Sequence, residues 1–338
     1  MNNLLWFSEI GKDDLEICGE KAVSLAELYN IGIPIPQGFV ITSNAYQKFL
    51  QENNINKQIQ NILSNLNLDD LKLLQKKAEE IQEIILKAEI PEDLKQEIYE
   101  SYENLNVDNE VLKSGNKNAL SLIKMGRSLP YVAVRSSKIS EGDFPTFLSV
   151  KGNNSLSLSI KKCWASLFTS SLIHKREKNN IEYDKILISI IIQRMIDSES
   201  SGIIFTINPL THNENELMIE STYGLSELII ANNVNSNVYI IDKQNNEIKS
   251  KKTPKQDYMV IREETLNKNL KRQVPENMKE QVLDEQQILQ LVDYSKKIEQ
   301  FYNKAVDIEY AIESGKMNIL QVKPLRAIKM FYSKKENV

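Results

Sequence analysis

The chain has 338 residues, with an apolar fraction of 41% and a charged fraction of 26%, values typical of globular proteins. Its net charge is −4, with lysine and glutamate intermixed, which excludes the strong basic field of a nucleic-acid-binding protein. The longest apolar run, residues 186–192, is far shorter than the ~20 residues of a membrane span. With two cysteines and no apolar leader, the sequence predicts a soluble, cytoplasmic protein of two domains or lobes that contacts neither nucleic acid nor membrane.

Helical patterns dominate the first half of the sequence. Apolar residues recur there at helical spacing, and long stretches are rich in leucine, lysine, glutamate and glutamine. In chain order, we expect a helix over 13–30, a strand over 39–42, a helix pair over 44–105 broken at Pro91, a strand over 131–137 and a helix over 155–180.

Strand patterns dominate the second half. The run 186–196 is continuously apolar and rich in isoleucine, which is typical of a strand buried on both faces. We expect strands over 186–196, 201–209, 216–221 and 237–242, then a polar surface excursion over 243–280, a helix over roughly 285–303 and a hairpin over 307–325.

The predicted hairpin carries four polar side chains at intervals of two residues: Asp307 and Glu309, then Gln321 and Lys323. A three-residue loop at 314–316 would place Glu309 opposite Gln321, and Asp307 opposite Lys323. All four side chains then lie on one face, because side chains alternate along a strand. A two-residue Ser-Gly turn would put Glu309 and Gln321 on opposite faces, so a shared site requires the loop of three residues.

Six polar side chains lie within these apolar elements and indicate a nucleotide site. Lysine and arginine suit phosphate oxygens, while glutamate and glutamine oxygens suit Mg²⁺. A glutamine at the end of an apolar strand lies where exposed backbone groups can form hydrogen bonds with the edge of a nucleotide base. Taken singly, each residue also fits a plain structural role, such as an exposed helix lysine or a solvated face of cross-strand pairs. The six are Lys21, Arg135, Gln193, Glu309, Gln321 and Lys323.

Several ordered stretches are together far more specific than a single glycine motif. They are CGEKAVSLAEL (18–28), GIPIPQGFVITSNAYQKF (32–49), VAVRSS (132–137), KKCWASLFT (161–169), QRM (193–195), SGIIFTINP (201–209) and the hairpin DIEYAI…NILQVKPL. In this order they resemble the N-terminal ATP-binding domain of phosphoenolpyruvate synthase and pyruvate phosphate dikinase. Rifampicin phosphotransferase has a similar domain. The resemblance covers nearly the whole chain.

The resemblance implies the ATP-grasp fold, an α+β fold in which two lobes clamp MgATP. We expect a helix-rich N-terminal lobe over 1–185 and a strand-rich C-terminal lobe over 186–338. The resemblance also implies a role for each site residue. Lys21 and Arg135 would hold the phosphates and act in catalysis, Gln193, Arg194 and Met195 would form the adenine hinge, Glu309 and Gln321 would ligate Mg²⁺, and Lys323 would contact phosphate.

Four departures from the family pattern affect catalysis more than ATP binding. Glu20 stands where the family has glycine, and its carboxylate would repel a triphosphate unless it turns away or joins the metal. If Gly142 aligns with the family's last loop glycine, the loop that lies over the phosphates in the family is shorter here by about eight residues. Lys323 replaces an arginine and loses its bidentate geometry, and Ser226 replaces a glycine.

The resemblance implies an ATP-dependent phosphotransferase component that passes phosphate to a histidine on a separate partner domain or subunit, an arrangement similar to phenylphosphate synthase. This chain has only His174 and His212, and neither lies in the glycine-rich context of the family's phosphorylated histidine. Two other classes stay open: a nucleotide-binding sensor or scaffold without phosphotransfer, and a kinase that acts directly on a small acceptor. The polar ending FYSKKENV is typical of a natural terminus rather than of a fragment.

Overall fold

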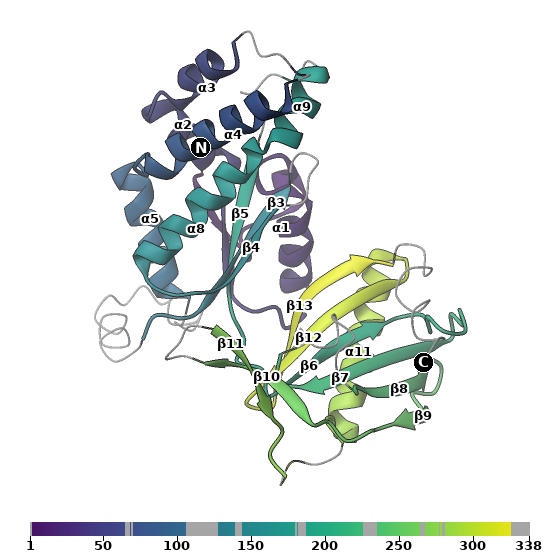
Figure 1. Ribbon diagram of the computed structural model, residues 1–338. Helices are drawn as coiled ribbons and strands as arrows, with labels where there is room; N and C mark the ends of the chain where they lie inside the picture. Colours follow the sequence, from purple (N-terminus) through teal and green to yellow (C-terminus); the bar gives the residue numbers. More distant parts are fainter. Residues whose placement is uncertain are drawn as a thin grey trace. The chain divides into compact units, whose positions relative to one another are not determined.

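The chain forms two compact units, each built around its own antiparallel sheet (Figure 1). The units are Met1–Asn30 with Gln37–Met195, and Ile31–Pro36 with Ile196–Val338. The α+β class expected from the sequence is confirmed. The computed structural model describes residues 2–64, 68, 70–105, 128–138, 144–179, 181, 187–225, 235–263, 268–276, 278 and 281–325.

The first unit contains a five-stranded sheet in the order β1-β2-β5-β3-β4. Its central strand β5 is the isoleucine-rich run predicted from the sequence, and six of its seven residues are buried. β5 pairs with β2 on one side and with β3 on the other. The strands are β1 (Leu4–Trp6), β2 (Gly38–Ile41), β3 (Val132–Lys138), β4 (Thr146–Val150) and β5 (Ile188–Arg194).

Helices cover both faces of this sheet. Ile188, Ile190 and Ile192 of β5 join a core with α4 and α8, whereas α1 packs on the opposite face, where the Ala22 N–H meets Ser137 of β3 (Figure 1). The helices are α1 (Leu15–Asn30), α2 (Ser43–Glu52), α3 (Ile55–Leu63), α4 (Leu71–Lys87), α5 (Glu92–Asn104), α8 (Asn153–Ala165) and α9 (Ser170–Lys178), with 3-10 turns η1 (Lys12–Asp14) and η2 (Ser166–Phe168).

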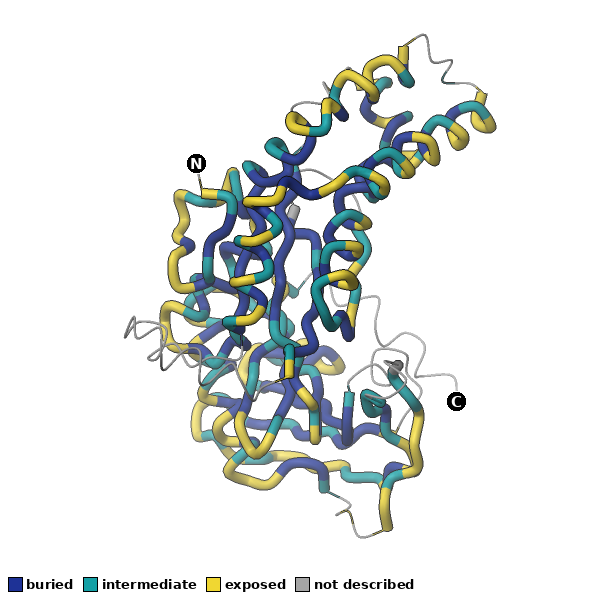
Figure 2. The backbone as a smooth tube through the Cα atoms, turned by 90° about the vertical axis from the view of Figure 1, so that its left-hand side faces the viewer, coloured by how far each residue is buried: buried dark blue, intermediate teal, exposed yellow. Residues whose placement is uncertain are grey.

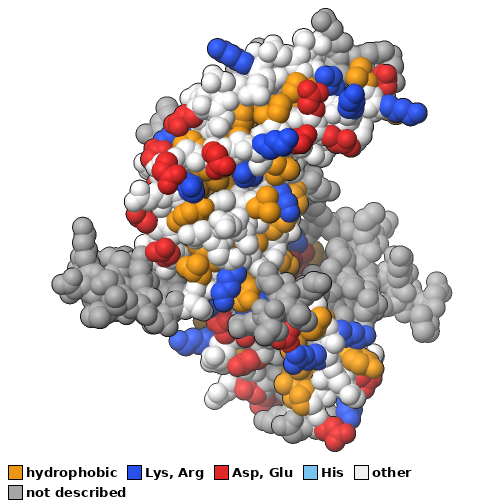
Figure 3. Space-filling view, turned by 60° about the vertical axis from the view of Figure 1, so that its left-hand side comes forward, with side chains coloured by type: hydrophobic (Ala, Val, Ile, Leu, Met, Phe, Trp, Pro, Cys, Tyr) orange, Lys and Arg blue, Asp and Glu red, His pale blue; other side chains and the backbone are white. Residues whose placement is uncertain are grey.

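Buried and exposed residues alternate along these helices at helical spacing (Figure 2). On the outer face, positive and negative side chains are intermixed (Figure 3) and form short-range ion pairs such as Lys77–Glu80 and Lys87–Glu83. No helix in the described ranges combines the length and apolarity needed to cross a membrane.

Two helical predictions were wrong in their boundaries. In place of the expected helix pair over 44–105, the described residues of this range form the four helices α2 to α5, because Asn54 adopts a left-handed conformation and Asp70 caps a new helix. The expected helix over 155–180 is divided into α8 and α9, because the Thr169 hydroxyl caps the second helix.

The second unit contains a six-stranded sheet in the order β13-β12-β6-β7-β8-β9. The predicted surface excursion over 243–280 instead contains β9 and a separate two-stranded ribbon. The sequence did not indicate β9 as a strand, because a lysine-rich strand at a sheet edge lacks the apolar pattern of a core strand. The elements are β6 (Ser200–Phe205), β7 (Glu216–Tyr223), β8 (Asn237–Asp242), β9 (Ile248–Lys252), the ribbon β10 (Tyr258–Glu263) and β11 (Lys268–Gln273), α11 (Glu285–Tyr302), β12 (Val306–Glu313) and β13 (Lys316–Pro324).

The two faces of the second sheet differ in burial. One row of paired side chains, Ile308, Ile204, Ile219 and Tyr239, is fully buried on the face that α11 covers (Figure 1). The face opposite to α11 includes Glu309 and other partly buried side chains, such as Ile203 and Val238, although Met218 and Thr222 of β7 on this face are buried. We call this second surface the open face.

Both edges of the second sheet have features that limit further strand pairing. At the β13 edge, the Ile319 N–H donates to the Pro34 carbonyl at 2.8 Å, and the segment that contains Pro34 is rich in proline. At the β9 edge, four of the five residues are exposed and three of them are lysines.

The compact units and the expected lobes of 1–185 and 186–338 divide the chain at different places. β5 belongs to the first unit because it is the central strand of the first sheet. The segment Ile31–Pro36 belongs to the second unit, in agreement with its backbone hydrogen bond to β13.

Gly202 of β6 has no room for a side chain, and we predict that Gly202→Ala lowers the free energy of unfolding by about 3 kcal/mol. A Cβ at this position would lie 2.0 Å from the Glu220 backbone oxygen and 2.6 Å from the Tyr310 hydroxyl. Chemical denaturation measures the loss. Gly11→Ala is the matched control, since its Cβ would meet nothing within 4 Å. Equal stability of the two variants would contradict the prediction.

Candidate functional site

The hairpin β12–β13 places the four predicted side chains on the open face. Glu309 lies opposite Gln321, and Asp307 lies opposite Lys323, so both predicted pairs are confirmed. The Lys323 ammonium lies 3.0 Å from Glu309 Oε1, a diagonal contact that requires both side chains to share a face.

The predicted reason for this pairing was wrong. The hairpin has a two-residue turn, in which Ser314 and Gly315 both have positive φ, the geometry of a type I′ turn. From the turn, Glu313 pairs with Lys316, and the register then shifts between Glu309 and Tyr310. Leu320 is the extra residue of a β-bulge, and this bulge restores the pairing that a three-residue loop would have given.

The carboxyl of Asp307 is partly desolvated and lies near a second carboxylate, Glu309. The pKa of Asp307 is raised above its usual value, chiefly because the carboxyl is half-buried, and the nearby Glu309 raises it further. The Lys323 ammonium opposes these effects without cancelling them. Asp307 had no role among the sequence predictions, although its two-residue spacing from Glu309 was a sufficient signal.

This donor set has the chemistry of an Mg²⁺ site. Asp307, Glu309 and Gln321 present side-chain oxygens on one face, and a cation there would relieve the repulsion between the two carboxylates. Within the described ranges, no three His, Cys, Asp or Glu side chains are close enough to hold a metal alone. The remaining ligands would therefore come from phosphate oxygens and water, as is usual for Mg²⁺.

In the first unit, Lys21 lies in the first turn that follows a break in α1. Gly19 has φ 76° and ψ 160°, which are not helical angles, so the regular helix restarts after this residue. Such a conformation strongly favours glycine. Lys21 therefore lies close to a helix N-terminus, where backbone N–H groups and the helix dipole favour anions.

Two buried serines fix this break against the sheet. The Ala22 N–H donates to Ser137 Oγ at 3.0 Å. Ser189 Oγ lies within hydrogen-bond distance of the Cys18 carbonyl oxygen and 3.0 Å from that of Ser137. Sequence reasoning missed both serines, although each lies an even number of residues from a predicted site residue on its strand.

Arg135 and Gln193 lie on the same face of the first sheet as these serines. Arg135 is two residues from Ser137 on β3, and Gln193 is four residues from Ser189 on β5. Gln193 pairs with Ala133 and Ile191 pairs with Arg135, so Arg135 and Gln193 are diagonal neighbours. Gln193 is buried, whereas Arg135 is partly exposed. The first unit thus groups Lys21, Arg135 and Gln193 on its α1 face.

The other two predicted hinge residues differ from Gln193. The Arg194 side chain lies on the opposite face by alternation, and its N–H donates to the Gln37 carbonyl at 2.9 Å. The Met195 N–H donates to the Tyr131 carbonyl, and its sulfur accepts from the Ser149 N–H at 2.9 Å. Of the three predicted hinge residues, Arg194 is the one whose side chain the strand geometry places least well for a contact with adenine.

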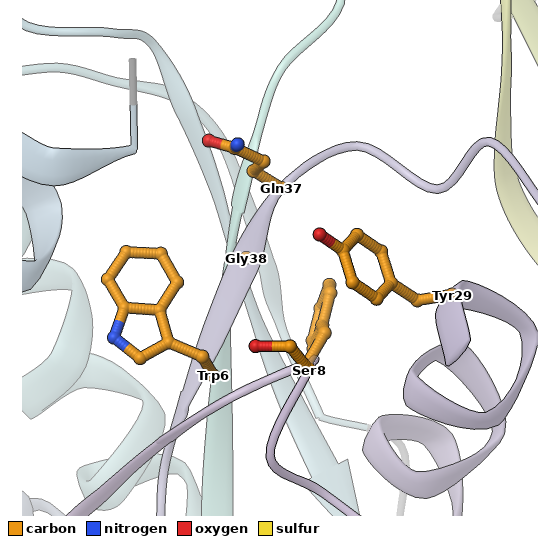
Figure 4. A pocket seen from close by; sticks show the side chains of 6 residues that line it. Trp6, Ser8, Tyr29, Gln37 and Gly38 are labelled. Carbon is orange, nitrogen blue, oxygen red and sulfur yellow. The ribbon is translucent and has the colours of Figure 1, made fainter. Parts of the chain in front are cut away.

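A small cavity lies beside Gly38, which pairs with Gln193, and Figure 4 shows that Trp6 and Tyr29 flank it. Its volume of about 10 Å³ suits one water. A second cavity of about 170 Å³ lies in the second unit beside the β10–β11 ribbon. Typical ligand pockets measure about 300–1,000 Å³, so neither cavity has the size of a nucleotide pocket.

Comparisons with known proteins identify the family. The family described as "Pyruvate phosphate dikinase, AMP/ATP-binding domain" matches residues 15–337. The chain belongs to this family. It is therefore an ATP-binding domain of the α+β ATP-grasp class.

Curated relatives include phosphoenolpyruvate synthases, and this chain covers about a quarter to a half of their length. It is 33% identical to a probable phosphoenolpyruvate synthase of Methanocaldococcus jannaschii, over 97% of this chain and 27% of that protein. It is 33% identical to a probable phosphoenolpyruvate synthase of Methanothermobacter thermautotrophicus, over 96% of this chain and 46% of that protein. It is 32% identical to the phosphoenolpyruvate synthase of Pyrococcus furiosus, over 96% of this chain and 44% of that protein.

Among solved structures, the D-alanine-D-alanine ligase of Helicobacter pylori matches 63% of this chain and 47% of that chain. The sequence identity is 12% and the TM-score is 0.28, values too low to support an argument.

Two of the departures from the family pattern lie in the described part of the domain. Glu20 is exposed beside the break in α1, and Lys323 is paired with Glu309. Gly142 and Ser226, at which the resemblance implies a shortened loop and a replaced glycine, lie outside the described residues.

We predict that Ser137→Ala destabilises the first unit, because it leaves the buried Ala22 N–H without its acceptor. The expected loss is about 1–3 kcal/mol in the free energy of unfolding, measured by chemical denaturation. Ser155→Ala, an exposed serine of α8, should change stability little. A wild-type value for Ser137→Ala would show that this hydrogen bond is dispensable.

We predict that Asp307→Asn raises the melting temperature of the nucleotide-free domain at pH 7. A carboxyl whose folded-state pKa is raised stabilises the fold below its unfolded pKa, and this contribution is lost as the pH rises through the folded value. The neutral amide removes that penalty, so the gain should shrink as the pH is lowered towards about 4. Thermal melts from pH 4 to 7 measure it, and a variant less stable than wild type at pH 7 would contradict it.

Proposed function

We propose that this domain is a MgATP-dependent phosphotransferase component that passes phosphate from ATP to a histidine on a separate partner domain or subunit. Its family membership and its partial coverage of phosphoenolpyruvate synthases support this proposal. Phosphoryl transfer requires mainly positioning and charge neutralisation from the protein. A nucleotide-binding domain can therefore carry one half of the reaction while another part of the system supplies the histidine.

The observation that carries the proposal is the shared face of Asp307, Glu309, Gln321 and Lys323. In the second unit, Mg²⁺ would bind Glu309 and Gln321, with Asp307 beside them, and would also hold phosphate oxygens. Lys323 would exchange its contact with Glu309 for a phosphate once the metal neutralises that carboxylate. Mg²⁺ would thereby supply the charge neutralisation that phosphoryl transfer requires.

The first unit supplies the remaining proposed contacts. Lys21, beside the restarted helix, and Arg135, on the adjoining sheet face, provide positive charge for phosphates. Gln193 and Met195 lie at the end of the central strand, where they would contact the adenine base. Arg194 would take part through its backbone, because its side chain lies on the other face.

A nucleotide sensor without phosphotransfer is the second candidate, and one observation favours it. Lys323, which stands where the resemblance implies an arginine, is already paired with a proposed metal ligand. A single ammonium lacks the bidentate fork of a guanidinium, so it stabilises a transferring phosphate less. Under this candidate, ATP binds and is not turned over.

We expect MgATP to bind the wild-type protein in a calorimetric titration, and Glu309→Ala to weaken that binding at least about ten-fold, because charge-assisted contacts are lost. In the presence of a histidine-bearing partner domain of a related system, the wild type should also release AMP or ADP. Nucleotide chromatography and a phosphate assay measure this turnover.

Glu214→Ala is the matched control, since Glu214 is an exposed carboxylate of the same unit outside the hairpin. Its MgATP affinity should equal that of the wild type. Binding without turnover in the presence of the partner would support the sensor. Unchanged affinity of Glu309→Ala would contradict the metal assignment, and absence of any ATP binding would overturn the proposal as a whole.

A further inference from the structure

The cavity beside the β10–β11 ribbon is a feature that none of the proposed nucleotide contacts uses. Its volume is about 170 Å³, and every residue that lines it belongs to the second unit. The lining comes from three segments: the end of β7, the stretch that leads into β10, and the end of β11 with the stretch that follows it.

Hydrogen bonds between these segments fix the walls of the cavity. The buried Gln256 Oε1 accepts from the Thr222 hydroxyl at 3.0 Å and from the Tyr223 N–H at 3.1 Å, which joins the stretch before β10 to β7. The Val274 N–H donates to the Asp257 carbonyl at 2.9 Å, which joins the same stretch to the end of β11. Contacts within the chain thus hold the walls, and small-molecule sites are usually pre-formed in this way.

The size of the cavity limits the size of its ligand. A cavity of about 150 Å³ accommodates benzene, and a water molecule takes up about 30 Å³ in the liquid. The volume of about 170 Å³ therefore suits a molecule of about six to nine non-hydrogen atoms, which is far smaller than a nucleotide.

Charges of both signs line the cavity. Lys255 supplies an ammonium, whereas Asp257 and Glu276 supply carboxylates, and all three residues are exposed. Among the residues that the structure describes, none of these three side chains forms an ion pair or a hydrogen bond with another side chain. Their charged groups are therefore available to a ligand.

Another part of the lining is apolar. It includes Val274, Pro275 and Met278, together with the buried Tyr223. Met278 is 38% exposed, so a ligand in the cavity would remove apolar surface from water. A methionine side chain is also flexible enough to fit the shape of a small apolar group.

Together, the charges and the apolar wall restrict the chemical class of the ligand. A simple anion would pair with Lys255 and be repelled by two carboxylates, and a simple amine would leave Lys255 unpaired. A zwitterion satisfies charges of both signs, and a small apolar group on it would cover the apolar wall. An α-amino acid with an apolar side chain combines these three parts in one small molecule.

We propose that this cavity binds a small α-amino acid with an apolar side chain. Lys255 pairs with the carboxylate of the ligand, and Asp257 and Glu276 pair with its ammonium. The apolar side chain of the ligand packs on Val274 and Met278. This inference goes beyond the proposed function and does not rest on it, because no lining residue is a proposed nucleotide contact.

The test compares L-valine with isobutylamine and isovalerate, which are valine without its carboxylate and valine without its ammonium. Saturation-transfer NMR of the ligand methyl groups, which all three compounds share, measures each affinity in a titration. The wild type should bind L-valine and should bind each of the other two at least about five-fold more weakly, the effect of losing one exposed ion pair.

Two variants assign the contacts. Lys255→Gln should weaken L-valine binding at least about five-fold without weakening isobutylamine binding, because isobutylamine has no carboxylate. Glu276→Gln should weaken L-valine binding without weakening isovalerate binding, because isovalerate has no ammonium. The matched controls are Lys252→Gln and Glu214→Gln, at exposed residues of the same unit that do not line the cavity, and both should bind L-valine as the wild type does.

Absence of L-valine binding to the wild type would overturn the inference, and this arm needs no variant to fold. Equal affinities of the wild type for all three compounds would also overturn it, as would equal L-valine affinities of Lys255→Gln and Lys252→Gln. MgATP binding by the same protein is measured separately, so the cavity assignment and the proposed function can fail independently.

Discussion

The two-residue period of a β-strand is the constraint on which the candidate site depends. Side chains of β13 alternate between the open face and the core under α11, and the turn alone would leave Gln321 and Lys323 facing that core. The bulge at Leu320 adds one residue and reverses the alternation for the rest of the strand. Without it, the ammonium of Lys323 would enter an apolar layer that includes Ile308, at a large cost in desolvation.

The first unit uses a comparable local irregularity. The break at Gly19 divides α1 and places Lys21 in a first turn, and hydrogen bonds from the sheet satisfy backbone groups on both sides of the break. Ser189 and Gln193 interrupt the apolar sequence of β5 only on the face towards α1, while Ile190 and Ile192 fill the core on the other face. In both units, a departure from regular geometry directs polar groups away from the core.

Much of this arrangement could be predicted from sequence, for reasons that differ between elements. The strand at β5 follows from local apolarity, whereas the opposition of Glu309 and Gln321 was predicted from a three-residue loop that the structure does not have. The two-residue turn could not be derived, because a bulge leaves no strong local signal and a three-residue loop gives the same pairing. The four helices of 44–105 were predicted as two, because Asn54 and Asp70 act through backbone geometry and a capping bond within a uniformly helix-forming composition.

Other features depend on contacts between segments far apart in sequence. Ser137 and Ser189 are unremarkable as sequence, and their role appears only when β3 and β5 lie side by side. The lysine-rich strand β9 lacks an apolar pattern because it lies at an edge, so composition alone indicated a surface segment. Family resemblance supplied the residue roles that neither apolarity nor alternation could supply.

The edges of the six-stranded sheet have a consequence for how another protein chain can associate with the second unit. At the β13 edge, the Ile319 N–H already donates to the carbonyl of Pro34. Pro34 and Pro36 have no N–H with which to continue a ladder of hydrogen bonds. At the β9 edge, the positive charges of Lys249, Lys251 and Lys252 disfavour pairing with an incoming strand. Association by strand addition is therefore disfavoured at both edges of the six-stranded sheet.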